Sequence, residues 1–387
     1  MNKILFETSP SHYSHWKLDV KGKTAWLTMN VNEDKGIFDG YKLKLNSYDL
    51  GVDIELFDII NRLRFESPQV SVVVLRSGNE KAFSAGANIK MLAGASHAHK
   101  VNFCKFTNET RNLIESSSNE SEQYFICAIE GVCAGGGYEL ALACDHIILS
   151  DDGSSSVALP EVPLLAVLPG TGGLTRVTDK RKVRRDLADV FCTMEEGVKA
   201  HKAKEWKLVD TITKKSKLSQ DIDLLIEEFD SKTKKPDDIK GIKLNSLKKR
   251  IIDQNHIRYS TVELQIDRNK NNANIIIHGP TEIPPSSIEQ IINSGDEFWP
   301  LRCVREIDDI LLHLRFNELD LGVIIFSSIG SIDNLNEYDK LMHANKSNWF
   351  INETKNYWGR TLKRVDLTSR SLVTLIEPGS CFCGFLA

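Results

Sequence analysis

The hydrophobic pattern is clearest in a segment near the middle of the first half of the chain. An apolar run, Tyr124–Ile129, is followed by a turn and by three consecutive glycines at positions 135–137. Glu139 then opens an apolar, helix-forming segment that ends near Cys144. Short apolar runs bounded by turn residues are typical of buried strands. The pattern therefore predicts a strand, a tight turn and a helix.

A second apolar run, upstream, predicts a partner for this segment. Val72–Leu75 is uninterrupted and mostly β-branched, which indicates a buried parallel strand. It is followed by Lys81–Met91, which begins as a turn of small residues and continues into a helix. The chain thus twice places a strand before a small-residue turn and a helix.

Glycines at the start of a helix suit one kind of chemistry. Without a Cβ atom, their backbone N–H groups can face open space, where the helix dipole favours negative charge. Two such donors form an oxyanion hole. A glycine turn before a helix is also common as a turn alone. The first strand, turn and helix could supply one donor and the Lys81–Met91 turn the other.

Together the two turns resemble the enoyl-CoA hydratase/isomerase (crotonase) superfamily. The resemblance rests on Phe83–Asn88, which is similar to the family's Phe-x-Ala-Gly-Ala-Asp loop, and on the Gly-Gly-Gly-x-Glu string that ends at Glu139. It implies that the amides of Ala87 and Gly136 form the oxyanion hole. The family's usual aspartate is Asn88 here, which keeps the turn chemistry and removes a charge.

A third block adds a second carboxylate. Ser156–Pro163 and Leu168–Gly173 match the superfamily's Pro-Glu and Gly-x-Gly-Gly signatures, and they contain Glu161. Two carboxylates at one pocket can have well-separated pKa values, so that one acts as an acid and the other as a base. The resemblance implies catalytic roles for Glu139 and Glu161. The alternative is that both are surface glutamates.

A narrower resemblance concerns the substrate. Four strings are similar to the ring-opening lyases of aerobic benzoyl-CoA degradation: Gly40–Leu56, Val101–Asn112, Leu164–Arg185 and Leu362–Arg370. The resemblance runs from Trp16 to the last residue. It implies hydrolytic C–C cleavage of an oxidised benzoyl-CoA (2,3-epoxide or dihydrodiol) with release of formate. Cys104 is a candidate pocket residue, although a lone buried cysteine is more often an inert small hydrophobe.

Two other functions remain open. A plain enoyl-CoA hydratase or isomerase would share the oxyanion hole and both glutamates. An inactive CoA-thioester-binding subunit is the alternative from another functional class, and the incompleteness described next motivates it.

The second half of the chain repeats short pieces of the first half. Three stretches recur in the same order: Leu63–Phe65 as Leu314–Phe316, Val72–Ser77 as Val323–Ser328, and Ile129–Gly131 as Ile376–Gly379. We therefore expect an α/β crotonase-like ββα superhelix in tandem, with one complete unit and a second, incomplete and degenerate unit. The expected domains are 1–213, a helical or linker segment 214–258 containing a helix at Ile222–Phe229, and 259–387.

The second repeat differs from the first where the chemistry is expected. Its glycine-rich turn, Gly379–Gly384, is not followed by a glutamate, so we expect this copy to be catalytically silent. It stops at Ala387, where the first repeat enters the helix at Glu139, and a missing C-terminal part is expected on that basis. Half of a layered unit leaves one sheet face uncovered.

Composition narrows the partners without changing this interpretation. The 387 residues carry a net charge of −4, which argues against nucleic acid as the main partner. The eight cysteines form no C-x-x-C pair, so neither a metal site nor a disulfide framework is indicated, and no apolar run approaches a membrane span. We expect a cytoplasmic homo-oligomer that binds an acyl-CoA and needs no cofactor beyond the CoA of its substrate. The basic cluster Lys180–Arg185 is either a solvated helix face or a contact for the CoA phosphates.

Overall fold

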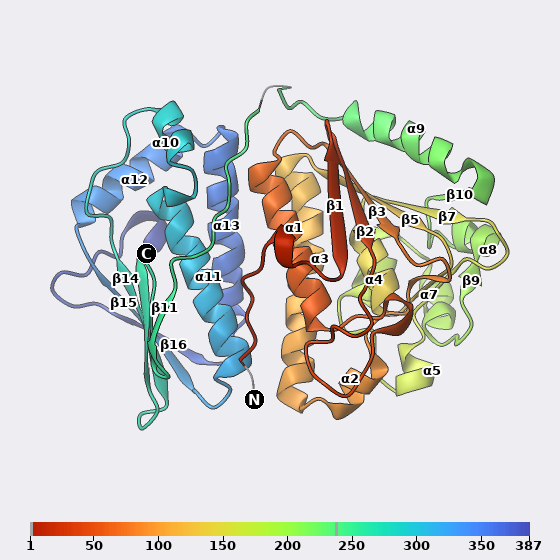
Figure 1. Ribbon diagram of the computed structural model, residues 1–387, viewed down its shortest axis with the longest axis horizontal. Helices are drawn as coiled ribbons and strands as arrows, with labels where there is room; N and C mark the ends of the chain where they lie inside the picture. Colours follow the sequence, from red (N-terminus) through yellow and green to blue (C-terminus); the bar gives the residue numbers. More distant parts are fainter. Residues whose placement is uncertain (1–2, 237–238) are drawn as a thin grey trace. The chain divides into compact units, whose positions relative to one another are not determined.

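The chain folds into two compact units in the computed structural model, which describes residues 3–236 and 239–387. The large unit is Thr8–Lys240, and the small unit joins the described residues up to Glu7 with Gly241–Ala387. Each unit has a mixed sheet of its own with helices packed against it (Figure 1). The predicted α/β class is therefore confirmed.

The main sheet of the large unit has six strands. β1 and β2 are antiparallel and all later neighbours are parallel. The strand order is β1 (Trp16–Lys21), β2 (Thr24–Met29), β3 (Val72–Ser77), β5 (Tyr124–Ile129), β7 (His146–Ser150) and β10 (Thr211–Thr213). Both apolar runs identified in the sequence are strands of this sheet, β3 and β5, and they lie side by side.

A second, four-stranded sheet in the same unit carries the loops of interest. Its strands are short, and their order is β4 (Ala82–Ser84), β6 (Val132–Ala134), β8 (Ser156–Ala158) and β9 (Val198–Lys199). The sequence predicted a single strand before the glycine turn. Instead the chain leaves the main sheet after β5, turns at Gly131, which has a φ of +76°, and forms β6 in the second sheet.

Helices cover both faces of the main sheet in the large unit. α1 (Leu50–Glu66) and α3 (His97–Ser121) pack against each other on one side, and α9 (Leu218–Asp230) lies on the other (Figure 1). Side chains of α9, including Leu218 and Phe229, pack against alternate residues of the strands, such as Val72. The other helices of this unit are short: α2 (Ile89–Gly94), α4 (Gly136–Ala143), α5 (Glu161–Leu165), α6 (Gly173–Thr175), α7 (Arg185–Cys192) and α8 (Ala200–Glu205).

The small unit has one six-stranded sheet. Its strands are antiparallel as far as β14 and parallel afterwards. Their order is β11 (Arg250–Asp253), β12 (His256–Arg258), β13 (Val262–Asp267), β14 (Asn272–His278), β15 (Val323–Ile329) and β16 (Ser371–Leu375). Its helices are α10 (Ile288–Ser294), α11 (Trp299–Asn317), α12 (Ile332–Ala344) and α13 (Trp349–Asp366).

The observed division of the chain differs from the predicted domains 1–213, 214–258 and 259–387. The predicted helix at Ile222–Phe229 is confirmed as part of α9, but it belongs to the large unit because its apolar side covers the main sheet. The strands β11 and β12, which the prediction left in the linker segment, pair into the sheet of the small unit. The described residues up to Glu7 also join the small unit, where Asn317 bonds both backbone groups of Ile4.

Within the described ranges, no helix combines the length and the apolar character needed to cross a membrane.

Candidate active site

The three glycines form the start of α4, where the backbone takes a conformation that other residues rarely adopt. Gly135 has φ +54° and ψ −131°, and the helix begins at Gly136, three residues before the predicted start at Glu139. A Cβ atom on Gly136 would lie 1.8 Å from the hydroxyl oxygen of Tyr48, and one on Gly137 would lie 2.6 Å from Cβ of Ser84. The last two glycines are therefore needed because other residues approach the backbone closely.

The loop after β4 lies directly against this turn. Gly86 has a φ of +83°, and a Cβ atom there would lie 2.7 Å from the carbonyl oxygen of Ala134 and 3.0 Å from the backbone nitrogen of Gly136. β4 also pairs in parallel with β6. The two small-residue turns, 48 residues apart in the sequence at Ala87 and Gly135, therefore meet in space, as the sequence suggested.

Both candidate hole amides lack an acceptor among the described residues. The backbone amide of Tyr48 donates to the carbonyl of Gly86 (3.0 Å), and the carbonyl of Tyr48 accepts from the amide of Asn88 (2.9 Å). These two bonds form an isolated parallel bridge between Tyr48 and Ala87. In a parallel bridge the N–H and C=O of only one of the two residues form the bonds, here those of Tyr48. The N–H of Ala87, the opposite residue, therefore points away from Tyr48. Across residues 3–236 and 239–387, the amides of Ala87 and Gly136 donate to no acceptor.

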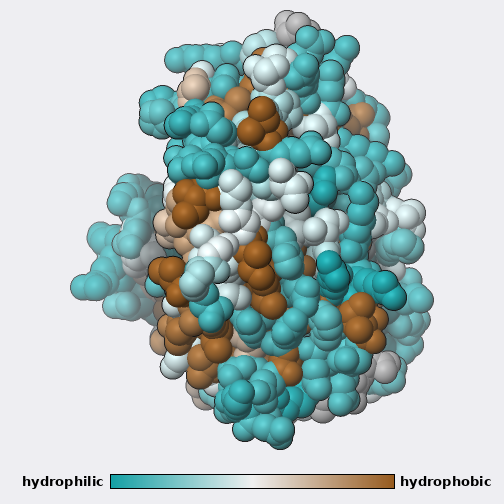
Figure 2. Space-filling view, turned by 90° about the vertical axis from the view of Figure 1, so that its left-hand side faces the viewer, coloured by the Kyte–Doolittle hydropathy of each residue, from teal (hydrophilic) through white to brown (hydrophobic). Residues whose placement is uncertain are grey.

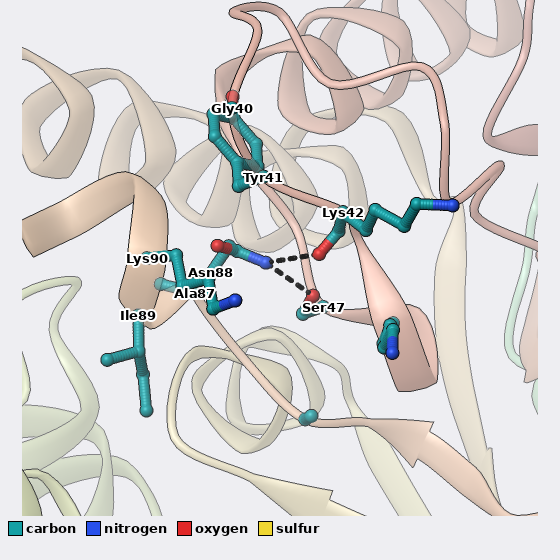
Figure 3. Close-up of a pocket in the computed structure, with 10 residues that line it drawn as sticks. Gly40, Tyr41, Lys42, Ser47, Ala87, Asn88, Ile89 and Lys90 are labelled. Carbon is teal, nitrogen blue, oxygen red and sulfur yellow. Dashed lines mark hydrogen bonds between the residues drawn. The ribbon is translucent and has the colours of Figure 1, made fainter. Parts of the chain in front are cut away.

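Asn88, which occupies the position where the superfamily usually has aspartate, both accepts and donates hydrogen bonds through its side chain. Its side-chain oxygen accepts from the amide of Met91 (3.0 Å) and caps α2. Its side-chain nitrogen donates to the carbonyl of Lys42 (2.9 Å) and to the hydroxyl of Ser47 (3.1 Å), as Figure 3 shows. A carboxylate could not donate these two bonds. The amide therefore joins the Ala87 loop to the segment before Tyr48.

Glu139 lies in the first turn of α4 and is only 2% exposed. Its Oε1 atom accepts from the backbone amides of Thr171 (2.9 Å) and Gly173 (2.8 Å), and its Oε2 atom accepts from the Thr171 hydroxyl. Gly172, between them, has a φ of +88°. The Gly-x-Gly-Gly block thus holds the carboxylate of Glu139, a role that the sequence did not reveal.

Glu161 is the first residue of α5 and is half-buried. Its Oε1 atom lies 3.1 Å from the position of a Cβ atom on Gly135, and its Oε2 atom is buried without a hydrogen-bond partner in the described part of the chain. Burial, followed by the negative charge of Glu139, raises the pKa of Glu161 to about 7. The alternative of two surface glutamates is therefore wrong.

Two cysteines lie near these acids. A Cβ atom on Gly170 would lie 3.0 Å from Sγ of Cys104. Burial, with a further contribution from Glu139, raises the pKa of Cys104, so its thiol stays protonated near neutral pH. Burial, with contributions from Glu161 and Asp189, raises the pKa of Cys192 to about 11. The structure thus brings Cys104 to the segment that holds Glu139, but as a neutral thiol.

A cavity of about 760 Å³ opens beside the Ala87 loop (Figure 3). Its lining residues come from two segments: Gly40, Tyr41, Lys42, Lys44 and Ser47 from the first, and Ala85, Ala87, Asn88, Ile89 and Lys90 from the second. Three of them are lysines, one of which, Lys42, also pairs with Asp34 (2.8 Å). The sequence analysis missed these lysines, because only the fold brings Lys90 to the other two.

Three of the five cations in the basic cluster Lys180–Arg185 pair with acids of the large unit. Lys180 pairs with Glu115 (3.1 Å) and Arg181 with Asp210 (2.7 Å), and Arg184 pairs with Asp186 (2.6 Å) at the surface. All eight cysteines are free thiols. Within residues 3–236 and 239–387, no group of three or more histidine, cysteine or acidic side chains is arranged to hold a metal ion.

Comparisons with known proteins agree with the geometry. The enoyl-CoA hydratase/isomerase family model matches residues 42–277. The benzoyl-CoA-dihydrodiol lyase of Aromatoleum evansii is 51% identical over 381 residues, which cover 98% of this chain and 68% of that protein. The fatty acid oxidation complex subunit alpha of Aliivibrio fischeri is 31% identical over 159 residues, 40% of this chain and 20% of that protein.

Among solved structures, the enoyl-CoA hydratase of Bacillus anthracis is 29% identical, with a TM-score of 0.48, and the match covers 56% of this chain and 77% of that one. The family match covers more than half of this chain and includes both turns and both glutamates. The chain belongs to the enoyl-CoA hydratase/isomerase family.

Proposed function

We propose that this protein is a carbon–carbon lyase that opens the oxidised ring of a benzoyl-CoA. The reaction would cleave the ring hydrolytically and release formate and an aliphatic semialdehyde CoA thioester. The observation that carries the choice of substrate is the 51% identity, over 98% of the chain, to a benzoyl-CoA-dihydrodiol lyase. The site geometry supports the chemistry that such a reaction needs, as follows.

The thioester carbonyl would bind at the two turns. The amides of Ala87 and Gly136 have no acceptor in the described part of the chain, and they belong to loops that touch at Gly86. Donors held in place before the reaction stabilise an enolate-like oxygen more strongly than they stabilise the starting carbonyl. These amides would therefore lower the barrier for steps that place charge on the thioester oxygen.

The two glutamates would have different roles, because they are held differently. Glu139 accepts three hydrogen bonds from Thr171 and Gly173, which fix its position. Glu161 has a buried oxygen without a partner and a pKa of about 7, so it can donate a proton at neutral pH. We assign proton donation to the substrate oxygen to Glu161, and positioning of the attacking water to Glu139.

The CoA part of the substrate would extend into the cavity beside Ala87. Lys42, Lys44 and Lys90 line this cavity, and lysine ammonium groups bind phosphate oxygens through charge-assisted hydrogen bonds. All the proposed groups belong to this chain, and the CoA belongs to the substrate. Eight free cysteines support a reducing, cytoplasmic location, and we retain a homo-oligomer as a proposal.

A direct assay separates this function from its alternatives. Purified protein is incubated with ring-epoxidised benzoyl-CoA, and formate is measured enzymatically. Crotonyl-CoA hydration is measured in parallel. Formate release that is lost in the Glu161→Gln variant supports the proposal. Crotonyl-CoA hydration without formate would identify a hydratase, and thioester binding without turnover of either compound would identify a binding subunit.

A further inference from the structure

Tyr48 is a buried aromatic residue that lies between the two candidate hole amides. Its backbone bridges to Ala87, and its hydroxyl oxygen lies 1.8 Å from the position of a Cβ atom on Gly136. The residue is 2% exposed. It therefore contacts both loops at the point where a thioester oxygen would bind.

The ring of Tyr48 is held in place from behind by α3. The ring centroid of Phe103 is 6.0 Å away, and the guanidinium carbon of Arg111 lies 5.5 Å from the Tyr48 centroid. Arg111 is itself fixed by a buried ion pair with Asp53, which also accepts from the hydroxyl of Thr107 (2.8 Å). The orientation of the tyrosine is thus set before any ligand binds.

The Tyr48 hydroxyl is available to a ligand. Among all residues that the structure describes, none donates to it or accepts from it. Burial, partly offset by Arg111, raises the pKa of Tyr48 well above its usual value, and the carboxylates of Asp53 and Glu139 add to the rise. The group is therefore a proton-bearing donor at every working pH.

The thioester oxygen does not need this donor. A carbonyl oxygen has two lone pairs, and the amides of Ala87 and Gly136 can serve both. Tyr48 is not part of the lining of the lysine-lined cavity, and its hydroxyl oxygen lies against Gly136, in the first turn of α4, which also carries Glu139. The donor thus faces the region where the acyl group would lie.

We infer that the Tyr48 hydroxyl donates a hydrogen bond to a second oxygen of the substrate, one carried by the acyl group itself, and so selects oxygenated acyl groups over hydrocarbon ones. This inference rests on the proposed function, because it takes the thioester oxygen to bind at Ala87 and Gly136. It makes Tyr48 a substrate-binding residue of that site.

Binding measurements test the inference without requiring turnover. Calorimetry compares benzoyl-CoA-2,3-dihydrodiol with benzoyl-CoA, which lacks ring oxygens, in a Glu161→Gln background that turns over the ligand about 100-fold more slowly. Adding Tyr48→Phe should weaken dihydrodiol binding about tenfold, as expected for one neutral hydrogen bond. Binding of benzoyl-CoA should change less than about twofold, because its single oxygen stays on the two amides.

Tyr138→Phe is the matched control. Tyr138 is also buried, but its hydroxyl donates to the carbonyl of Leu208 (2.7 Å). This variant should lower the unfolding temperature without changing the ratio of the two affinities, whereas Tyr48→Phe should change the ratio and leave the temperature within about 1 °C. Equal weakening of both ligands, or no weakening of the dihydrodiol, would overturn the inference. Failure of the proposed function would appear separately, as absence of formate from the unmodified protein.

Discussion

The large and small units share the first part of their topology. In each, two antiparallel strands lead through a long helix to a parallel strand, β1, β2, α1 and β3 in one and β13, β14, α11 and β15 in the other. They also share buried polar contacts. In each unit a glutamate of the long helix accepts hydrogen bonds from two consecutive backbone amides, and an aspartate one turn later accepts from a tyrosine hydroxyl. In the large unit Glu55 accepts from Ser14 and His15, and Asp58 accepts from Tyr13. In the small unit Glu306 accepts from Ser260 and Thr261, and Asp309 accepts from Tyr259. The framework is therefore common to both units.

The units differ where the proposed chemistry is located. In the large unit, the chain after β5 forms the glycine turn that leads to Glu139. In the small unit, the chain after β16 forms the turn 379–384, and no glutamate follows it. The comparison indicates that the framework does not depend on the glycine turn, because the contacts around the long helix occur in both units whereas a glutamate follows the turn in only one.

The units also differ in how their sheets are covered. In the large unit, α9 buries one face of β3 and β5. In the small unit, β16 is exposed along its whole length, including Leu372 and Val373, and the space-filling view of this side shows apolar side chains gathered on the surface (Figure 2). Exposed apolar area contributes nothing to folding stability. We therefore expect the stability of the large unit to depend on its sheet–helix packing more than that of the small unit.

The largest expected effect is on turnover, which should depend on two glutamates of the large unit and not on a glutamate of the small unit. Glu139→Gln and Glu161→Gln should each lower the turnover of ring-oxidised benzoyl-CoA by about 10²–10⁴-fold, because each removes an acid–base or water-positioning group. Glu377→Gln, an exposed residue of the small unit, is the control and should leave turnover unchanged. Formate release under saturating substrate is the measurement. Full activity in both large-unit variants, or an equal loss in the control, would break the comparison.

A methyl group at the hole should be nearly as harmful. In Gly136→Ala the added carbon would lie 1.8 Å from the hydroxyl of Tyr48, so either the amide or the tyrosine must move. We expect about a 10²-fold loss of kcat, the size seen when one oxyanion donor is lost. Gly359→Ala in α13 adds a methyl group in open space and should preserve activity. An active Gly136→Ala variant would show that this amide is not a donor.

The covered and uncovered sheets can be compared by deleting apolar side chains. Phe229→Ala in α9 should lower the free energy of unfolding by about 3 kcal/mol, because it leaves a cavity against the main sheet. Val373→Ala on exposed β16 should change it by less than about 0.5 kcal/mol. Urea titration of both variants measures the difference. Similar losses would mean that the β16 face is covered in solution.

The smallest expected effect is a change in folding stability with pH, which should differ in sign between Glu161 and an acid that stabilises the fold. The pKa of Glu161 is raised in the folded protein, so its ionisation destabilises the fold as the pH rises from about 4.5 to above 7. Glu161→Gln should therefore stabilise the protein at pH 8, by on the order of 2 kcal/mol, and have little effect at pH 4. Glu115→Gln should destabilise it at pH 8: burial opposes ionisation of Glu115, but the hydrogen bonds and charges of Arg176 and Lys180 outweigh it and lower the pKa of this carboxyl. Destabilisation by both substitutions at pH 8 would place Glu161 among the structural acids.

Much of the site could be predicted because it is encoded locally. Gly86, Gly135–Gly137 and the two glutamates stand in short strings whose glycines are required by positive φ angles or by close backbone contacts. The strands β3 and β5 were predictable for a similar reason, since unbroken apolar runs fit a sheet buried on both faces.

The remaining features depend on contacts between distant segments. The amides of Thr171 and Gly173 reach Glu139 only because the chain returns to α4. Lys90 and Lys42 line the same cavity because the side chain of Asn88 donates a hydrogen bond to the carbonyl of Lys42. Similarly, α9 follows the first unit in a polar stretch, and only its packing on the sheet assigns it there and not to a linker.

The pH dependence of formate release tests the central claim most directly. The account makes protonated Glu161, with its pKa of about 7, the proton donor, and the nearby Cys192 titrates only at about 11. With ring-epoxidised benzoyl-CoA between pH 6 and pH 9, kcat/KM of the unmodified protein should fall up to tenfold per pH unit above about 7. The Glu161→Gln variant should be about 100-fold slower and lack this limb. The same alkaline limb in both proteins would contradict the account, as would the absence of formate from the unmodified protein.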